Sequence, residues 1–231
     1  MTETTAVTGM SGIDGDFEKA CNAGISENEW RLALEEKQGA ELCGLFAKAH
    51  VAICGVGGLG SNIAVSLARA GVGHLHIIDF DKVEITNLNR QQYFADQIGM
   101  TKVFALKENL KRIAPFCNVK AECIEIGPEI IRGLFSEESI ICEAFDKAEA
   151  KAMLAENVLQ EYPDKILVSG SGMAGIGPAN EMKTRRVTQR LYICGDEKSD
   201  VDVGDCLLGT RVLICAAHQA HMVLRLIAGM E

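Results

Sequence analysis

A glycine-rich turn between an apolar run and a helical segment constrains the fold of this chain more than any other feature. The apolar run covers residues 51–54, and the turn has the spacing G-x-G-x-x-G at Gly55, Gly57 and Gly60, with Gly58 inside it. A short apolar run bounded by glycines is typical of a buried parallel strand. Glycine lets the backbone approach a phosphate closely, and the helix that follows presents free N–H groups to an anion. The spacing therefore predicts a strand, turn and helix that bind a nucleotide phosphate.

A carboxylate follows the next apolar run, where a nucleotide site has room for a ribose. The next expected strand, 75–78, ends at Asp79, about 20 residues beyond the turn, and an acid there can bond a ribose hydroxyl. This pattern fits NAD as well as ATP, and a glycine turn can also serve only to pack a helix on a strand. A Walker-type loop is excluded because no Lys-Ser or Lys-Thr follows Gly60.

Polar and cationic side chains follow Asp79 closely in the sequence. They distinguish a site for ATP from a site for NAD. They are Asn87, Arg90, Gln91 and Lys102. A dinucleotide's pyrophosphate is held mainly by backbone amides, whereas a triphosphate that is about to lose pyrophosphate develops more charge and calls for Arg and Lys. Either cation alone can be an ordinary surface residue. The whole set favours ATP chemistry and disfavours a nicotinamide-dependent oxidoreductase.

Apolar runs and helical segments alternate along most of the chain. Strands are expected at 51–54, 75–78, 119–124, 139–142 and 165–169, and helices at 59–70, 101–114, 128–135, 147–160 and 211–228. Such alternation predicts an α/β, Rossmann-like, mostly parallel sheet with helices on both faces. We expect antiparallel strands at 180–187 and 190–194, a helix from about residue 17 to residue 50, a flexible segment at 1–15, and one domain over 16–231.

Composition narrows the class of protein further. The 231 residues are 48% hydrophobic, which suffices for a sizeable core, and no run is long and apolar enough for a membrane span. A net charge of −9 argues against a broad nucleic-acid surface. Nine cysteines without a C-x-x-C pair fit a reducing cytoplasm. We therefore expect a cytoplasmic protein that binds neither nucleic acid nor a membrane.

Several stretches together resemble the ThiF/MoeB/HesA family, the bacterial relatives of ubiquitin-activating enzymes, and its short ThiF-type members most of all. They are GVGGLGSN, IIDFDKVEITNLNRQQYF, GMTK, EAFDKAEAK, the KTRRV strand, LYICGDE and AAHQAHMVLRLIAG, spread over residues 51–229. The DFD…NLNRQ element is highly specific.

The resemblance implies an adenylyltransferase that uses ATP and Mg²⁺. Its substrate would be the C-terminal Gly-Gly carboxylate of a ThiS-like sulfur carrier protein in thiamine (thiazole) biosynthesis, with pyrophosphate released. Asp79 would bind ribose, Asn87, Arg90 and Lys102 would hold the phosphates, and Asp81 and Gln91 would complete the nucleotide site. A homodimer and a cysteine desulfurase as sulfur donor are further expectations.

The resemblance also implies that Asp146 is the magnesium ligand and that it forms the catalytic set with Arg90 and Lys102. It follows the apolar run 140–142, and acids at parallel strand ends face the ligand crevice. Asp146 can equally be the N-cap of the next helix.

The chain also departs from its longer relatives. Without their two C-x-x-C pairs we expect no zinc, and the N-terminal arginine that they offer to the partner subunit's ATP site has no counterpart beyond Arg31 and Lys37. Cys206 is a candidate functional thiol, but Asp202 occupies the place of the family's catalytic cysteine. The acceptor also stays open, since a molybdopterin carrier, a peptide C-terminus or a tRNA-linked carboxylate fits the same pattern. A regulatory nucleotide-binding module without turnover is the remaining alternative.

Overall fold

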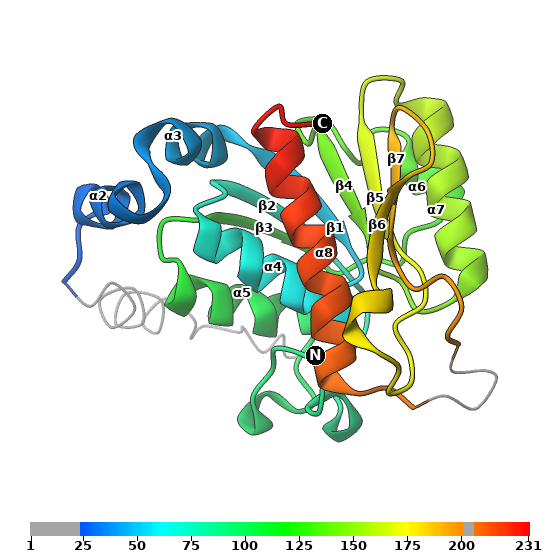
Figure 1. Cartoon of the computed structure of the whole chain (residues 1–231). Helices are drawn as coiled ribbons and strands as arrows, with labels where there is room; N and C mark the ends of the chain where they lie inside the picture. Colours follow the sequence, from blue (N-terminus) through cyan, green and yellow to red (C-terminus); the bar gives the residue numbers. More distant parts are fainter. Residues whose placement is uncertain (1–23, 201–205) are drawn as a thin grey trace, which may run out of the picture.

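A seven-stranded sheet forms the centre of the molecule (Figure 1). The computed structural model describes residues 24–200 and 206–231, so the segment predicted to be flexible at 1–15 lies outside the described residues. The strands are β1 (His50–Cys54), β2 (His74–Ile78), β3 (Asn118–Glu122), β4 (Ile140–Glu143), β5 (Ile166–Gly170), β6 (Lys183–Arg186) and β7 (Leu191–Gly195). Their order is β3-β2-β1-β4-β5-β7-β6, and every neighbouring pair is parallel except β6 and β7.

Helices cover both faces of this sheet. The helices are α2 (Glu27–Gln38), α3 (Ala40–Lys48), α4 (Gly58–Ala70), α5 (Lys102–Ile113), α6 (Pro128–Ile131), α7 (Ala148–Glu161) and α8 (Gly209–Ile227). Strand residues alternate between the two faces. Ile53 and Ile77 pack with α4, α5 and α8 in one apolar core, while Ile141 and Leu167 pack with α6 and α7 in the other. The predicted α/β, Rossmann-like fold with helices on both faces is confirmed.

Three predicted elements differ from the structure. The helix expected up to residue 50 is broken by Gly39, whose φ of 88° ends α2, and β1 already begins at His50. The helix expected at 128–135 ends at Ile131, because Arg132 is extended and Gly133 has a φ of 88°. Of the two strands expected to be antiparallel, only β6 is. β6 and β7 form a hairpin whose second strand inserts next to β5, so β7 runs parallel to β5.

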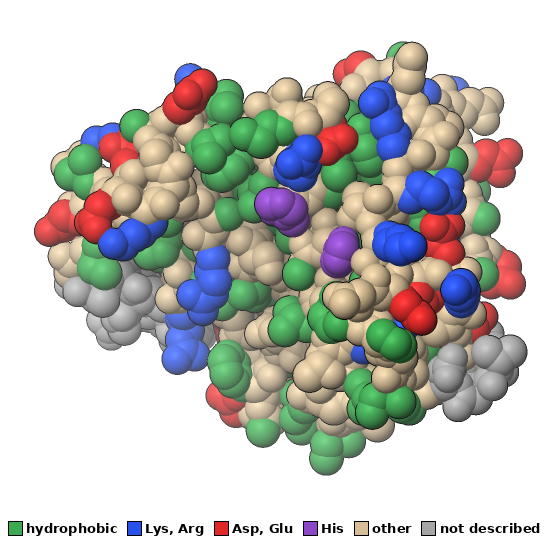
Figure 2. Space-filling model, viewed as in Figure 1, with side chains coloured by type: hydrophobic (Ala, Val, Ile, Leu, Met, Phe, Trp, Pro, Cys, Tyr) green, Lys and Arg blue, Asp and Glu red, His purple; other side chains and the backbone are tan. Residues whose placement is uncertain are grey.

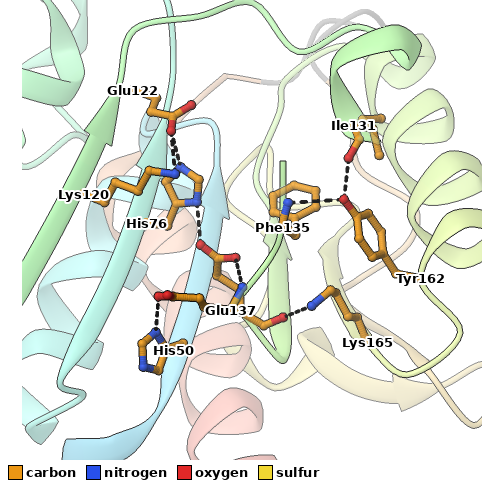
Figure 3. A network of polar contacts seen from close by, with 10 residues as sticks. His50, His76, Lys120, Glu122, Ile131, Phe135, Glu137, Tyr162 and Lys165 are labelled. Carbon is orange, nitrogen blue, oxygen red and sulfur yellow. Dashed lines mark hydrogen bonds and ion pairs between the residues drawn. The ribbon is translucent and has the colours of Figure 1, made fainter. Parts of the chain in front are cut away.

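A network of paired polar groups begins at the amino ends of β1, β4 and β5 and extends through the middle of β2 to the last residue of β3 (Figure 3). We call it the amino-edge network, and it consists of His50, His76, Glu122, Glu137, Glu138 and Lys165. His76 is 3% exposed, and its two ring nitrogens lie 2.6 Å from Glu138 Oε1 and 3.4 Å from Glu122 Oε1. Lys165 Nζ donates to the Glu138 carbonyl at 2.6 Å. The network therefore ties β2 and β3 to the segments that precede β4 and β5.

No helix within the two described ranges combines the length and the apolar character that crossing a membrane requires.

Candidate active site

The strand order has a switch point at β1, which lies between its parallel neighbours β2 and β4. We call the space outside the carboxyl ends of these three strands the crevice. The chain leaves β1 toward β2 on one side, whereas β4, on the other side, is reached only later in the sequence. Connections therefore diverge at the carboxyl ends of these strands, and ligands of open α/β sheets bind at such a switch point. The glycine turn follows β1, Asp79 follows β2 and Asp146 follows β4, so the structure brings these predicted site residues to one edge.

The glycine turn adopts the close backbone packing that its sequence predicts. Gly55 has a φ of 85°, and a Cβ there would lie 2.8 Å from the carbonyl oxygen of Ala144. A Cβ at Gly60 would collide with the carbonyl oxygen of Gly55. The helix α4 begins at Gly58, and no side chain caps its first turn. Its free N–H groups therefore remain directed at the crevice.

Asp79 holds the glycine turn in addition to any role toward a ligand. Its Oδ2 accepts the Val56 N–H at 2.8 Å, and its Oδ1 accepts the Asp81 N–H at 2.8 Å. The buried hydroxyl of Tyr93 donates to the Val56 carbonyl at 2.7 Å, so both polar groups of the Val56 backbone are fixed. Burial, with the nearby Asp79 and Asp81, raises the pKa of Tyr93, which keeps the phenol protonated. Sequence patterns did not indicate this role for Tyr93, which lies in the stretch IIDFDKVEITNLNRQQYF.

Lys102 begins α5 and carries its ammonium into the site from a buried position. Its residue is 7% exposed, and its Nζ lies 2.7 Å from Oδ2 of Asp81, whose side chain is about half exposed. The backbone N–H of Lys102 also donates to the Asp81 carbonyl. The predicted pair of Asp81 and Lys102 is therefore in contact, and the carboxylate holds the ammonium at the strand ends.

Arg90 lies over the glycine turn without a carboxylate partner among the described residues. Its Nη1 donates to the Thr86 carbonyl at 2.8 Å and to Asn89 Oδ1 at 2.9 Å. A Cβ added at Gly58 would lie 3.7 Å from Arg90 Cγ and Cδ. A guanidinium with no counter-charge beside a helix N-terminus is an anion-binding arrangement.

Asn87 and Gln91 flank Arg90 in the sequence and are both buried. Asn87 Oδ1 accepts the Glu84 N–H at 3.0 Å, so its carbonyl group shapes the segment that carries Arg90. Gln91 reaches the turn, since a Cβ at Gly57 would lie 3.7 Å from its Nε2. Its buried Oε1 has no hydrogen-bond partner within 24–200 and 206–231. A buried acceptor without a donor costs about 1–3 kcal/mol, so a ligand that supplies one fits here.

Asp146 is exposed in the turn between β4 and α7. It has no hydrogen bond or ion pair to a described residue. The alternative prediction for this residue, an N-cap, is wrong because α7 begins at Ala148 after Lys147, with no side-chain cap. Within the described ranges, no three His, Cys, Asp or Glu side chains come together as a metal site of their own. A single free carboxylate still suits Mg²⁺, which binds one or two carboxylates together with substrate phosphates.

Arg211 and Asp196 form a buried ion pair that the sequence did not reveal. Arg211 also donates from Nε to the Ala174 carbonyl at 2.8 Å and from Nη1 to the Gly177 carbonyl at 2.6 Å. Burial alone would raise the pKa of Asp196, but the amides of Ser199 and Lys198 and the Arg211 guanidinium outweigh it and lower the pKa to about 2. The Asp196 side chain is therefore buried although the residue begins an acidic stretch of the sequence, of which 201–205 lie outside the described residues. The pair orders the glycine-rich loop that follows β5.

Other singled-out residues lie away from the crevice. Arg31 and Lys37 pair with Glu35 and Glu36 on α2. His218 and His221 line a hollow of about 620 Å³ between α8 and β6. Figure 2 shows cationic side chains gathered around these histidines, over a β6 strand whose four residues are all exposed. Cys206 is exposed, and its carbonyl accepts the Gly175 N–H at 2.7 Å.

Comparison with known proteins identifies the class to which this fold and this site belong. The model of the ThiF family matches residues 32–231, nearly the whole chain. The chain therefore belongs to the ThiF family, and the resemblance seen in its sequence is confirmed.

Curated relatives resemble the chain over about half of its length. The tRNA threonylcarbamoyladenosine dehydratase of Escherichia coli is 33% identical over 130 residues, which are 55% of this chain and 48% of that protein. The adenylyltransferase and sulfurtransferase UBA4 of Eremothecium gossypii is 33% identical over 130 residues, 56% of this chain and 29% of that protein. The chain thus spans less than half the length of these two relatives.

Solved structures share the fold. The E. coli tRNA N6-threonylcarbamoyladenosine dehydratase TcdA, in complex with ATP, superimposes with a TM-score of 0.80 at 21% identity, covering 89% of this chain and 97% of that one. E. coli MccB with MccA-N7isoAsn gives a TM-score of 0.65 at 22% identity, covering 82% and 60%. At these identities the likeness concerns the fold alone.

Proposed function

We propose that this chain uses ATP to adenylate a carboxylate, as the name adenylyltransferase says of the relative UBA4. The observation that carries the proposal is a pair of cations after β1 and β2: Arg90 at the glycine turn has no carboxylate partner among the described residues, and the buried Lys102 is held by Asp81. A nicotinamide dinucleotide needs neither charge, whereas a triphosphate that loses pyrophosphate gains from both.

The residues at the crevice fit ATP and a magnesium ion. The glycine turn and the start of α4 would receive phosphate oxygens, and Asp79 would accept a ribose hydroxyl with a lone pair that Val56 and Asp81 leave free. The orphan Oε1 of Gln91 offers one further acceptor. Asp146 would hold Mg²⁺, which when bound neutralises charge on the phosphate oxygens.

The proposed substrate is the C-terminal Gly-Gly carboxylate of a ThiS-like sulfur carrier protein, in thiazole formation for thiamine. One carboxylate oxygen attacks the α-phosphorus of ATP, an acyl–O–P bond forms, and the bond to the pyrophosphate oxygen breaks. The attacking group is already ionised at neutral pH, so no side-chain base is required. Arg90 and Lys102 orient the phosphates and stabilise the charge that leaves with pyrophosphate.

A second acceptor has specific support, namely a carboxylate linked to tRNA. The E. coli relative named above and the structure with a TM-score of 0.80 are both tRNA threonylcarbamoyladenosine dehydratases. The chemistry at ATP would be the same, and only the attacking carboxylate would differ. The net charge of −9 favours a small protein partner over RNA. A homodimer, a cysteine desulfurase as sulfur donor and a cytoplasmic location also belong to this proposal.

ATP–pyrophosphate exchange tests the proposal directly. The purified chain is assayed with Mg²⁺ and a ThiS-like carrier, with the same carrier lacking its final glycine, and with a threonylcarbamoyl-tRNA. We expect exchange that requires the intact carrier. Exchange that requires the tRNA instead would overturn the carrier and keep adenylation, whereas absence of ATP binding would overturn the whole proposal.

A matched pair of arginine variants separates the site from general damage. Arg90→Ala should reduce exchange about a hundredfold or more. Arg69→Ala, at the other end of α4 and exposed, should leave exchange unchanged. Equal rates in the two variants would remove Arg90 from the site.

A further inference from the structure

A fully buried carboxylate lies at the floor of the crevice, directly before the turn that carries Asp146. Glu143 is the last residue of β4 and is 0% exposed. In the sheet it pairs with Cys54 of β1 on one side and with Ser169 of β5 on the other. An acidic residue is almost never fully buried unless it is paired, so its partners indicate what it does.

The Glu143 side chain has polar partners on three different elements. Its Oε2 accepts the Ser169 hydroxyl at 2.5 Å, and its Oε1 accepts the Phe145 N–H at 2.7 Å. Lys151 of α7 places its Nζ 3.1 Å from Oε1 and 3.0 Å from Oε2. The same ammonium donates to the Gly170 carbonyl at 2.9 Å. Glu143 and Lys151 therefore join β4, β5 and α7 at one point.

This point determines where the Asp146 turn lies. The Ala144 N–H donates to the Cys54 carbonyl at 2.9 Å, and the Phe145 N–H is held by Glu143, so the backbone is fixed up to the residue before Asp146. The turn also lies against the glycine turn, since a Cβ at Gly55 would lie 3.1 Å from Phe145 Cδ1. Asp146 itself has no polar partner among the described residues, so its place depends on these anchors.

Stability alone does not explain a charged pair at this position. A buried ion pair is often no more stable than well-packed apolar residues of similar volume. What the pair supplies, and apolar side chains do not, is a directional hold on the Phe145 N–H and the Gly170 carbonyl. Groups that orient a metal ligand in this way strongly affect the affinity for the metal.

We propose that Glu143 and Lys151 are positioning residues that hold the Asp146 turn in the orientation in which its carboxylate meets the magnesium ion bound with ATP. This inference rests on the proposed function. The pair acts through Asp146 and does not touch the nucleotide.

The test measures how Mg²⁺ changes the binding of ATP, by calorimetric titration of the folded protein without any acceptor. Glu143→Gln keeps the shape of the side chain and removes its charge. We expect it to raise the Mg²⁺ concentration for half-maximal enhancement of ATP binding about tenfold or more. The affinity for ATP without metal should stay within about twofold, because the glycine turn is intact. Asp146→Asn should show the same two effects.

A double variant and a rescue make the test specific for positioning. Glu143→Gln combined with Asp146→Asn should be no worse than Asp146→Asn alone, because both changes remove the same interaction. Glu143→Asp combined with Lys151→Arg retains both charges and should recover most of the wild-type Mg²⁺ response. If Glu143→Gln fails to fold, Ser169→Ala removes only one hydrogen bond from the carboxylate and is measured in its place, with a smaller shift in the same direction.

Glu138→Gln is the matched control. Glu138 is also a buried carboxylate beside β4, but it belongs to the amino-edge network. This variant should lower stability and leave the Mg²⁺ response unchanged.

The outcomes separate the two proposals. If the wild-type protein binds ATP with a Mg²⁺ response and Glu143→Gln keeps that response, or if the double variant is additive, positioning is overturned and the proposed function stands. If the wild-type protein binds no ATP, the proposed function is overturned and this inference with it.

Discussion

The amino-edge network and the carboxyl ends of the strands both contain acidic and basic side chains, but these side chains differ in how completely they are paired. In the amino-edge network, His76 lies between Glu138 and Glu122, and Lys165 is bonded to the Glu138 carbonyl. At the carboxyl edge, Lys102 is paired with Asp81, but Arg90 and Asp146 have no charged partner among the described residues. The paired groups stabilise the fold, whereas unpaired charges of opposite sign near the glycine turn are suited to binding a ligand. The predictions below are ordered by the size of the expected effect.

Lys102→Ala should have the largest effect and should act on catalysis. Removing a cation that stabilises the departing phosphates lowers the rate by about a hundredfold or more, roughly 2.7–4 kcal/mol. The measurement is the rate of acceptor-dependent ATP–pyrophosphate exchange. Lys107→Ala is the control, because Lys107 is exposed on the same helix and lines the hollow at the amino edge. A comparable loss in both variants would contradict the assignment of Lys102 to the site.

His76→Leu should lower the stability of the protein and leave its affinity for ATP unchanged. The substitution leaves the buried Glu138 carboxylate without its side-chain partner, which costs about 3 kcal/mol in free energy of unfolding. Chemical denaturation measures this loss, and ATP titration of the folded variant should give the wild-type affinity. A weakened ATP affinity with unchanged stability would contradict a purely structural role for the amino-edge network.

Acid should lower the stability of the protein by protonating a different carboxylate at each end of the strands, Asp196 at the carboxyl ends and Glu138 at the amino ends. The pKa of Asp196 is about 2 in the folded protein against 3.8 for the free group, so its stabilisation is complete above about pH 4 and is lost as the pH falls toward 2. The loss amounts to about 2 kcal/mol. Burial raises the pKa of Glu138, but the hydrogen bond from His76 and backbone amides lower it below its usual value, so acid also removes its contribution.

Denaturation midpoints measured from pH 7 to pH 2 check this expectation. Asp196→Asn should flatten the fall below pH 4, while Glu138→Gln should leave that part of the curve as it is. An unchanged slope in Asp196→Asn would show that other groups govern acid sensitivity at the carboxyl edge.

Cys206→Ala should have the smallest effect. The thiol is exposed, and the contact that Cys206 makes to the loop after β5 uses its backbone carbonyl, which alanine keeps. We expect exchange rates within about twofold of wild type. A loss of tenfold or more would make Cys206 a functional thiol.

Sequence patterns were sufficient where function depends on the ends of strands. The glycine turn, Asp79 and Asp146 each follow an apolar run, and parallel strands bring such positions to one edge whatever the details of packing. Contacts that depend on how a helix packs against the sheet were not accessible in this way. Glu143 with Lys151, and Asp196 with Arg211, are ion pairs whose partners meet only through the packing of α7 and α8. The sequence also did not predict that β7, rather than β6, pairs with β5, because either strand of a hairpin can pair with the outermost strand of a sheet.

The position of β1 also has a consequence for how the molecule forms during synthesis. Val51 pairs with Leu75, which follows soon in the chain, and with Ile140, which emerges much later. The half of the sheet with β2 and β3 can therefore assemble while β4 is still being made, but the crevice has only one wall until then. Parallel pairing across so long a connection is slow. A nucleotide that bridges the two walls would favour the completed chain by mass action and would draw the late half onto the early one.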